Sequence, residues 1–408
     1  MKNGTIIVGA GHAGVQAAAS LREEGYDGPV VLIGEENELP YHKPPLSKTF
    51  IKDAEARPQL LRGENFYATN NIDYRPGLHV ARIDLAGRRL ELAGGAPIAF
   101  DRLVLATGSR PRKPPIEGVG LAGVVSLREV ADARLIRELS ATCADVVVLG
   151  GGFIGLEIAA TLRAAGRNVT VVEAADRLLG RVVAPPIGAH VRRRLTELGV
   201  RILTGATVSR LEGENGHVSS ALTSDGERLP AQLVIVGVGV VPNVELAERA
   251  GIIVSNGIRI DERMRSSVPE VLSVGDVASY RHWLTGGDVR LESVQNATDQ
   301  ARLAARTIAG GSDAYAAVPW FWSDIGDMKL QMVGLAAGAD SHVIVGEPQE
   351  NRFSVYHFAG GRLVAIESVN RPADHMLGRK MLAAGFSPSR EMVLQGADAL
   401  KAALAAVG

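Results

Sequence analysis

The chain has 408 residues, a formal net charge of −1 and a composition that is 46% hydrophobic and 22% charged. A chain of this length exceeds one typical hydrophobic core, so we expect two or three domains. The near-zero charge gives no global argument for binding nucleic acid or a membrane, and no apolar run approaches the length of a transmembrane helix. The single cysteine, Cys143, excludes a disulfide within the chain and a paired-cysteine redox motif.

The N-terminal segment predicts a dinucleotide-binding turn. An apolar strand at residues 5–8 is followed by Gly9-Ala10-Gly11-His12-Ala13-Gly14 and by a helical pattern over residues 15–22. In such a turn the first glycine permits a sharp bend, the second lets the backbone approach a pyrophosphate, and the third lets the helix pack on the strand. The next apolar strand ends at Glu35, whose carboxylate can accept hydrogen bonds from ribose hydroxyls. Because the sequence enters its first strand almost at once, we expect no signal peptide and a cytoplasmic protein.

The same fingerprint recurs in the middle of the chain. A strand at residues 146–149 precedes Gly150-Gly151-Gly152-Phe153-Ile154-Gly155, a helical pattern over 156–165, and a further strand that ends at Glu173. The Glu173 carboxylate would repel a 2′-phosphate and so favours NADH over NADPH, although the nearby Arg177 weakens that preference. Since a protein that holds two dinucleotides can pass electrons between them, the duplication points to a flavoprotein that oxidises a nicotinamide nucleotide.

The remaining strands predict how the two units are nested. Short buried runs at residues 103–106 and 233–236 alternate with helical patterns, which is typical of a parallel sheet covered on both faces. Another strand, at residues 271–274, ends in Gly275-Asp276, and we assign it to the first sheet because an aspartate there would face the ligand crevice. Residues 237–243 predict the crossing back to that sheet. From about residue 320 the pattern changes to alternating stretches around Ala359-Gly360-Gly361, which predict a hairpin in a small α+β domain.

Over essentially its whole length the chain resembles the flavoprotein disulfide-reductase superfamily with two dinucleotide domains. The resemblance rests on both fingerprints, on Ala106-Thr107-Gly108 and on Gly275-Asp276. It implies an α/β fold of two doubly wound, Rossmann-like domains, with an NAD domain (112–240) inserted in an FAD domain (1–111 and 241–319), and a C-terminal α+β domain (320–408).

The branch of the superfamily is indicated by a missing thiol. The disulfide reductases and the NADH peroxidases keep cysteine beside the flavin, whereas the comparable stretch here, Tyr41–Lys48, has none. Its string Lys43-Pro44-Pro45-Leu46-Ser47-Lys48 is similar to that of bacterial oxygenase-coupled NADH:ferredoxin reductases, the putidaredoxin reductase type. Two further strings, Glu292–Ala297 and Pro319–Asp324, match the same branch, and Ile325 departs from it because relatives often have glutamine there. The string Glu292–Ala297 precedes a helical pattern from Thr298, and the N-terminus of that helix would point its positive dipole end at the flavin.

The resemblance also implies roles for individual residues. Lys48, Glu157 and Trp322 are the expected catalytic residues: Lys48 at the flavin N5 edge, Glu157 beside the nicotinamide, and Trp322 covering the flavin. Further expected FAD contacts are Gly9, Gly11, His12, Ala13, Gly14, Glu35, Lys43, Pro45, Ala106, Thr107, Gly108, Gly275, Asp276, Ser293 and Val294. Further expected NAD contacts are Gly150, Gly152, Phe153, Ile154, Gly155, Glu173 and Gly239, and we assign no metal site.

The expected reaction is hydride transfer from NADH to FAD, followed by single-electron transfer to a small acidic 2Fe–2S ferredoxin that supplies a cytochrome P450 or a Rieske-type oxygenase. Transient docking near the flavin edge would use basic residues, with the candidates Arg290, Arg302, Arg306, Lys329, Arg371, Arg379 and Lys380. Several alternatives remain: a rubredoxin or nitrite-reductase-type reductase, a thiol-free NADH oxidase or quinone reductase, and a flavin-dependent signalling protein like apoptosis-inducing factor.

Overall fold

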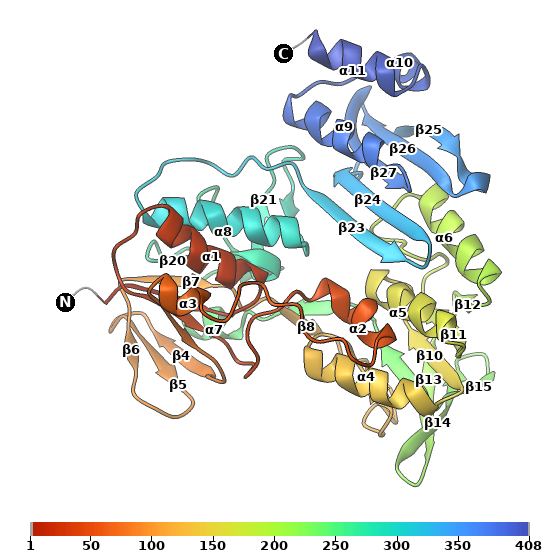
Figure 1. The fold of residues 1–408 in the computed structure, drawn as a ribbon, viewed down its shortest axis with the longest axis horizontal. Coiled ribbons are helices and arrows are strands. Elements are labelled where there is room, and N and C mark those ends of the chain that lie inside the picture. Colours follow the sequence, from red (N-terminus) through yellow and green to blue (C-terminus); the bar gives the residue numbers. More distant parts are fainter. Residues whose placement is uncertain (1–2, 407–408) are drawn as a thin grey trace. The chain divides into compact units, whose positions relative to one another are not determined.

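The computed structural model describes residues 3–406, and the chain divides into two compact units. The first unit comprises the residues up to His42, Gln59–Arg110 and Val241–Ala317. The second comprises Lys43–Pro58, Pro111–Val240 and the residues from Val318 onward. The chain leaves the first unit along β8 (Ser109–Pro111), which is labelled in Figure 1. It returns along β17 (Val240–Pro242).

The first unit is built on a five-stranded parallel sheet. Its strand order is β20 (Val271–Ser273), β7 (Arg102–Leu105), β1 (Thr5–Val8), β2 (Val30–Ile33) and β3 (Ile72–Arg75). Successive residues of a strand point to opposite faces. Accordingly, Ile7 packs in the cluster formed with α1 (His12–Glu23) and α8 (Val294–Ile308), while Ile6 and Val8 pack in a second cluster on the other face. The helices α1 and α8 run side by side on the sheet (Figure 1).

Shorter elements complete the first unit. They are α3 (Phe66–Thr69), β4 (Val80–Asp84), β5 (Arg89–Leu92), β6 (Ile98–Ala99), α7 (Glu245–Arg249), β18 (Val254–Ser255), β19 (Gly257–Arg259), η2 (Gly275–Val277), β21 (Ala278–Arg281) and β22 (Asp288–Val289).

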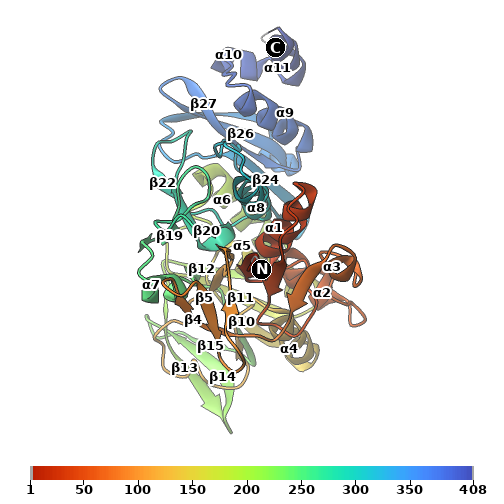
Figure 2. The same cartoon turned by 90° about the vertical axis from the view of Figure 1, so that its left-hand side faces the viewer.

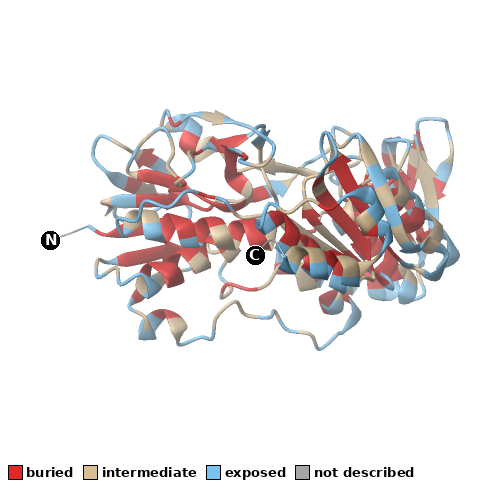
Figure 3. Ribbon diagram, turned by 90° about the horizontal axis from the view of Figure 1, so that it is seen from above, coloured by how far each residue is buried: buried red, intermediate tan, exposed pale blue. Residues whose placement is uncertain are grey.

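The second unit repeats the parallel sheet. Its strand order is β12 (Arg201–Thr204), β11 (Asn168–Glu173), β10 (Asp145–Leu149), β16 (Leu233–Val236) and β9 (Val124–Val125). The same unit contains η1 (Pro44–Ser47), α2 (Thr49–Lys52), α4 (Val130–Thr142), α5 (Phe153–Ala164), α6 (Pro185–Glu197) and the antiparallel strands β13 (Val208–Glu214), β14 (His217–Thr223) and β15 (Arg228–Pro230). The central strands and the inner faces of the helices are buried (Figure 3), as a sheet covered on both faces requires.

The C-terminal part of the second unit is an antiparallel sheet. Its order is β23 (Trp320–Ile325), β24 (Met328–Gly334), β27 (Arg362–Val369), β26 (Arg352–Ala359) and β25 (Ser341–Glu347). The helix α9 (Pro372–Ala383) lies against it (Figure 2), and it approaches closely at Gly378, where an added Cβ would lie 2.6 Å from Ile366 Cδ1. The remaining elements are η3 (Pro348–Glu350), α10 (Arg390–Leu394) and α11 (Ala397–Ala405).

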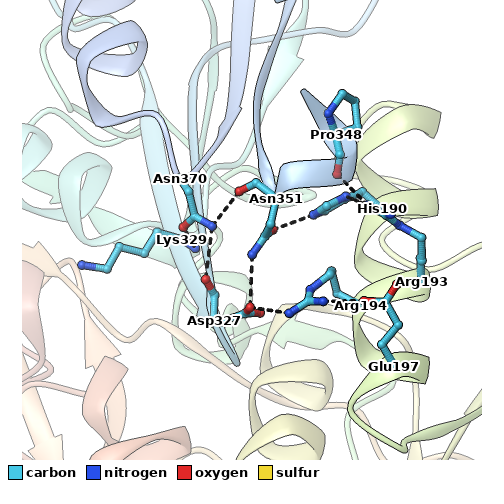
Figure 4. Close-up of polar contacts among 9 residues, drawn as sticks. All are labelled: His190, Arg193, Arg194, Glu197, Asp327, Lys329, Pro348, Asn351 and Asn370. Carbon is cyan, nitrogen blue, oxygen red and sulfur yellow. Dashed lines mark hydrogen bonds and ion pairs between the residues drawn. The ribbon is translucent and has the colours of Figure 1, made fainter. Parts of the chain in front are cut away.

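A polar cluster joins α6 to this C-terminal sheet (Figure 4). His190 Nδ1 accepts from Arg193 (3.0 Å), so its Nε2 donates to Asn351 Oδ1 (2.7 Å). Burial lowers the pKa of His190, which keeps the imidazole in this neutral form. Asp327 Oδ2 then accepts from both Asn351 (3.2 Å) and Arg194 (2.5 Å). These hydrogen bonds connect α6 to the turn of the β23–β24 hairpin, where Asp327 lies.

Several expectations about elements are confirmed. Strand β20 pairs with β7 in the first sheet, and β26 and β27 form the predicted antiparallel hairpin. Helix α8 begins at Val294, four residues before the predicted helical pattern, because Ser293 caps it. Among the helices that the structure describes, none is long and apolar enough to cross a lipid bilayer.

The segment Lys43–Pro58 differs from expectation, since it packs in the second unit and not with the rest of residues 1–111. Arg137 of α4 contributes to this packing: its guanidinium donates to the carbonyls of Phe50 and Asp53 and lies over the Phe50 ring, 4.7 Å from its centroid. The division into three domains with the boundaries given above stays a prediction.

Candidate dinucleotide and electron-transfer sites

The first fingerprint forms a cradle with one open side. Gly9 has φ +107°, and an added Cβ would lie 2.2 Å from the Ala106 carbonyl oxygen. At Gly14 an added Cβ would lie 1.8 Å from the Gly9 carbonyl oxygen, so both positions require glycine on packing grounds. A Cβ at Gly11 would meet no atom within 4 Å. Because Gly11 is the N-cap of α1, this open position lies where a pyrophosphate can approach backbone N–H groups.

The carboxyl ends of the strands in the first unit bring several of the other predicted FAD contacts to the same edge of the sheet. Glu35 follows β2, with an exposed carboxylate that pairs with His79 at 2.9 Å. Thr107 and Gly108 follow β7, and Thr107 is held by a reciprocal pair of hydrogen bonds with Asn243 (both 2.8 Å). Gly275, with φ +81°, brings the end of β20 against Ala13 of the fingerprint helix.

Asp276 and the N-terminus of α8 are held by their neighbours. Ser109 donates to Asp276 Oδ2 at 3.2 Å, and Arg290 Nη1 donates to the Asp276 carbonyl at 2.9 Å. Ser293 Oγ accepts from the Asn296 N–H at 3.0 Å, which caps α8 directly before Val294. The Nε2 atom of His12, a predicted FAD contact, lies 3.4 Å from Nδ1 of His42. Burial lowers the pKa of His42.

The second fingerprint repeats the geometry of the first. Gly150 has φ +104° and lies against the Gly237 carbonyl, and Gly155 lies against the Gly150 carbonyl. A Cβ at these positions would approach those oxygens to 2.4 and 2.5 Å, whereas a Cβ at Gly152 would meet no atom within 4 Å. Two cradles with the same open middle position therefore lie in the two units, one in each.

Glu173 lies beside the second cradle. Its carboxylate accepts from the N–H groups of Gly151 (2.5 Å) and Ala175 (2.7 Å), which fixes it at the end of β11. The guanidinium of Arg177 donates to the carbonyls of Val183 (2.9 Å) and Gly180 (2.5 Å). Gly239, another predicted NAD contact, follows β16 with φ +97°.

Glu157 is the centre of a buried polar cluster in the second unit. It is 6% exposed, and Lys48 Nζ lies 2.7 Å from its Oε2. Ser47 Oγ donates to the same oxygen at 2.5 Å, and Ser323 Oγ donates to Oε1 at 2.6 Å. Lys48 Nζ also donates to the Pro44 carbonyl at 3.1 Å. The structure thus brings together the predicted residues Lys48 and Glu157, and it adds two serines that the sequence had not singled out.

The two faces of β23 have different environments. Trp320 and Trp322 lie on one face, with ring centroids 5.6 Å apart, and Arg379 lies 4.5 Å above the Trp320 ring. Phe321 and Ser323 lie on the other face, against α5, where Phe321 contacts Phe153 with ring centroids 4.8 Å apart. The roles of Trp322, Lys43 and Pro45 toward FAD stay predictions.

The basic residues predicted for docking differ widely in their surroundings. Arg290 is a poor candidate, because its side chain is 10% exposed and pairs with Glu292 at 2.6 Å. Arg302, Arg306 and Arg371 each pair with an aspartate. Lys329 and Lys380 are exposed.

Residues 4–301 match the family model of the pyridine nucleotide-disulphide oxidoreductases, and residues 320–404 match a model named reductase C-terminal. The chain belongs to the pyridine nucleotide-disulphide oxidoreductase family. Rhodocoxin reductase from Rhodococcus erythropolis is 42% identical over 401 residues, which cover 98% of this chain and 94% of that protein. Putidaredoxin reductase from Pseudomonas putida is 41% identical over 384 residues, covering 92% and 91%.

A solved ferredoxin reductase for the CYP199A2 system from Rhodopseudomonas palustris has the same fold as this chain. The two superpose with a TM-score of 0.96 at 42% identity, covering 99% of this chain and 100% of the other. Family membership implies FAD and a nicotinamide nucleotide as the two dinucleotides, and the two open cradles fit a pair of pyrophosphates.

Proposed function

We propose that the chain is an FAD-dependent NADH:ferredoxin reductase. The overall reaction converts NADH and two oxidised ferredoxins to NAD⁺, two reduced ferredoxins and one proton. The observation that carries the proposal is the lysine-bearing loop of Lys43–Lys48, which holds the Lys48–Glu157 ion pair and no thiol. The single cysteine, Cys143, is buried, and burial raises the pKa of its thiol. Electrons therefore have no dithiol through which to leave.

Bound FAD would supply the chemistry that accepts a hydride from NADH and gives up electrons singly. The residues of the chain would bind the two dinucleotides, orient them and place charged groups near the flavin. The open sides at Gly11 and Gly152 would admit the two pyrophosphates, and the predicted contacts Glu35, Thr107 and Asp276 would bind FAD. Lys48 and Glu157 supply one positive and one negative charge fixed at 2.7 Å, and the predicted role of Lys48 is to stabilise negative charge on the reduced ring.

The arrangement at Glu173 supports a preference for NADH over NADPH. Two backbone N–H groups hold the carboxylate in place, so it is available to ribose hydroxyls and repels a 2′-phosphate. Arg177, which would favour the 2′-phosphate, already donates to two carbonyls. We expect Glu173→Ala to raise kcat/KM for NADPH at least tenfold relative to that for NADH, because about 1.4 kcal/mol of lost repulsion corresponds to a factor of ten. An unchanged ratio in steady-state assays would contradict this role.

The acceptor is inferred from relatives that are named as ferredoxin reductases, among them that of the CYP199A2 system and the component of an anthranilate 1,2-dioxygenase system. A cytochrome P450 or a Rieske-type oxygenase would then be the final consumer of the electrons, in the cytoplasm. Rubredoxin is the second candidate, because a rubredoxin-NAD(+) reductase from Pseudomonas putida is 40% identical over 368 residues.

The test is a reduction assay with separated acceptors. FAD content is measured first, the flavin is reduced with NADH without oxygen, and cytochrome c reduction is then followed with and without an added 2Fe–2S ferredoxin. We expect strong dependence on the ferredoxin. Equal rates without it, or rapid peroxide formation in air, would favour the oxidase, and dependence on rubredoxin alone would favour the second candidate.

A further inference from the structure

We propose that Ser47 and Ser323 are positioning residues for hydride transfer, which hold the Glu157 carboxylate and, through it, the Lys48 ammonium in one orientation. The inference rests on the proposed function, in which Lys48 and Glu157 are the charged groups near the reacting rings. Neither serine is one of the residues predicted above to touch a cofactor. Both act through Glu157.

The Glu157 carboxylate is surrounded by donors on both oxygens. Oε2 pairs with the Lys48 ammonium (2.7 Å) and accepts a hydrogen bond from the Ser47 hydroxyl (2.5 Å). Oε1 accepts a hydrogen bond from the Ser323 hydroxyl (2.6 Å). The two serines are 4% and 0% exposed. A carboxylate out of water is stable only when its lone pairs are paired. With Ser323 removed, Oε1 would keep no donor among the contacts that the structure gives it, and the carboxylate could turn away from Lys48.

The backbone sets Ser323 in register with Glu157. Phe153 and Glu157 are four residues apart on α5 and share one face, about 6 Å apart along the helix axis. Phe321 and Ser323 are two residues apart on β23 and share one face, about 6.7 Å apart along the strand. The Phe153–Phe321 ring contact at 4.8 Å therefore aligns the next pair, Glu157 and Ser323, at hydrogen-bonding distance.

Ser47 holds the cluster from a second segment. Its carbonyl accepts from Thr161 Oγ1 of α5 at 3.0 Å, while its hydroxyl donates to Glu157. This ties η1 to the same helix at two points one turn apart. Lys48 follows directly, and its Nζ is held between Glu157 and the Pro44 carbonyl. The ammonium is thus fixed by an anion whose own orientation depends on both hydroxyls.

The experiment measures flavin reduction by NADH in rapid mixing without oxygen, on the purified FAD-containing full-length protein. We expect Ser323→Ala to lower the limiting reduction rate about tenfold, the size expected from one hydrogen bond to a charged group. The NADH concentration for half-maximal rate should change less than about twofold, since the pyrophosphate cradle is untouched. Ser47→Ala should act in the same direction.

A double-mutant cycle separates positioning from general damage. In a Glu157→Ala background we expect Ser323→Ala to change the rate less than about twofold, because the serine then has no carboxylate to hold. Ser354→Ala is the matched control: Ser354 is a buried serine of the same C-terminal sheet that donates to another carboxylate, Asp374, at 2.8 Å. It should reduce at the wild-type rate. If Ser323→Ala does not fold, as judged by FAD content and melting temperature, the Ser47→Ala cycle decides.

Two results would overturn the inference: wild-type reduction rates in both serine variants, or a loss of equal size with and without Glu157. A failure of the proposed function looks different, since the wild-type protein itself would then bind no FAD or would not be reduced by NADH.

Discussion

The middle glycine of each fingerprint is the residue with space beside it. Gly11 and Gly152 have φ near −80° and −84°, values that any residue adopts, and an added Cβ meets no protein atom. We expect Gly11→Ala to fold normally and to weaken FAD binding about tenfold to a hundredfold, because crowding by one methyl costs about 1–3 kcal/mol. Gly152→Ala should keep its FAD and weaken NADH binding instead. Flavin retention on dilution and NADH titration distinguish the two.

Gly14→Ala provides the contrast for that pair. Its Cβ would lie 1.8 Å from the Gly9 carbonyl oxygen, so the backbone must move. We expect a clear loss of thermal stability even without FAD. If Gly11→Ala destabilised the protein without FAD as much as Gly14→Ala, the open cradle would not be the reason for glycine at position 11.

His282 makes stability depend on pH. It is fully buried, and burial lowers its pKa to about 4. The unfolded chain binds a proton at this histidine below about pH 6.5, whereas the folded chain binds it only near pH 4. The free energy of unfolding should therefore fall as the pH drops from about 6.5 to 4, by at most about 3 kcal/mol. Urea unfolding across this range should show a smaller slope in His282→Gln, while exposed His217→Gln should leave the slope unchanged.

Among single residues, the sequence predicts those whose positions are set by the fixed spacing of the dinucleotide fingerprint. The glycines and the acids Glu35 and Glu173 follow from a fingerprint with fixed positions, and their placement at the strand ends agrees with it. Ser47 and Ser323 could not be predicted in the same way, because a serine has no pattern that indicates its partner. Each lay within a motif already noted, and only the fold brings both to Glu157.

At the scale of an element, the cap of α8 gives a testable contribution. Ser293 Oγ accepts from the Asn296 N–H, and replacing such a cap with alanine costs about 1 kcal/mol. We expect Ser293→Ala to lower stability by that amount and also to weaken FAD binding, because Ser293 and Val294 are predicted FAD contacts. Ser389→Ala removes the equivalent cap of α10 and should leave FAD binding unchanged. Equal FAD affinities in both variants would argue against a role for α8 at the flavin.

Elements with strong apolar runs are the most predictable. Short Val, Ile and Leu runs predict β1, β2, β7 and β20 of the first sheet and β10, β11 and β16 of the second, and a glycine turn predicts the β26–β27 hairpin. The shorter or more polar edge strands β3, β9 and β12 are not predicted. The start of α8 was placed too late, because polar residues in its first turn hide the helical pattern that the Ser293 cap begins. The small sheet β4–β6 has no such pattern and was not predicted.

At the scale of the whole molecule, a salt-dependence experiment tests the predicted docking surface. The exposed lysines Lys329 and Lys380 are the better candidates, and Arg290 the worst, because it is nearly buried and paired. Attraction between an acidic ferredoxin and exposed cations is screened over about 8–10 Å at physiological salt. We expect raising the salt concentration to lower ferredoxin reduction severalfold more than ferricyanide reduction. The charge reversal Lys380→Glu should raise KM for ferredoxin, and equal salt effects on both acceptors would rule out steering.

The distribution of the chain between the two units was only partly predictable. Nesting of one dinucleotide unit in the other was expected from the order of strands, and β20 does return to the first sheet. The packing of Lys43–Pro58 in the second unit was not expected, because it depends on contacts of single long side chains. Arg137 of α4 donates to the segment, and Lys48 of the segment pairs with Glu157 of α5.

The alternation along β23 constrains how such proteins can be recombined. Tryptophans occupy one face of the strand, and the phenylalanine and serine that contact α5 occupy the other. Inserting or deleting one residue within the strand would exchange these faces and place an indole against the Glu157 carboxylate. A chimera that receives the C-terminal sheet of a relative should therefore tolerate a connector of altered length before residue 320. The chimera should fail to fold correctly whenever the junction adds or removes one residue within β23, because its two faces are then exchanged.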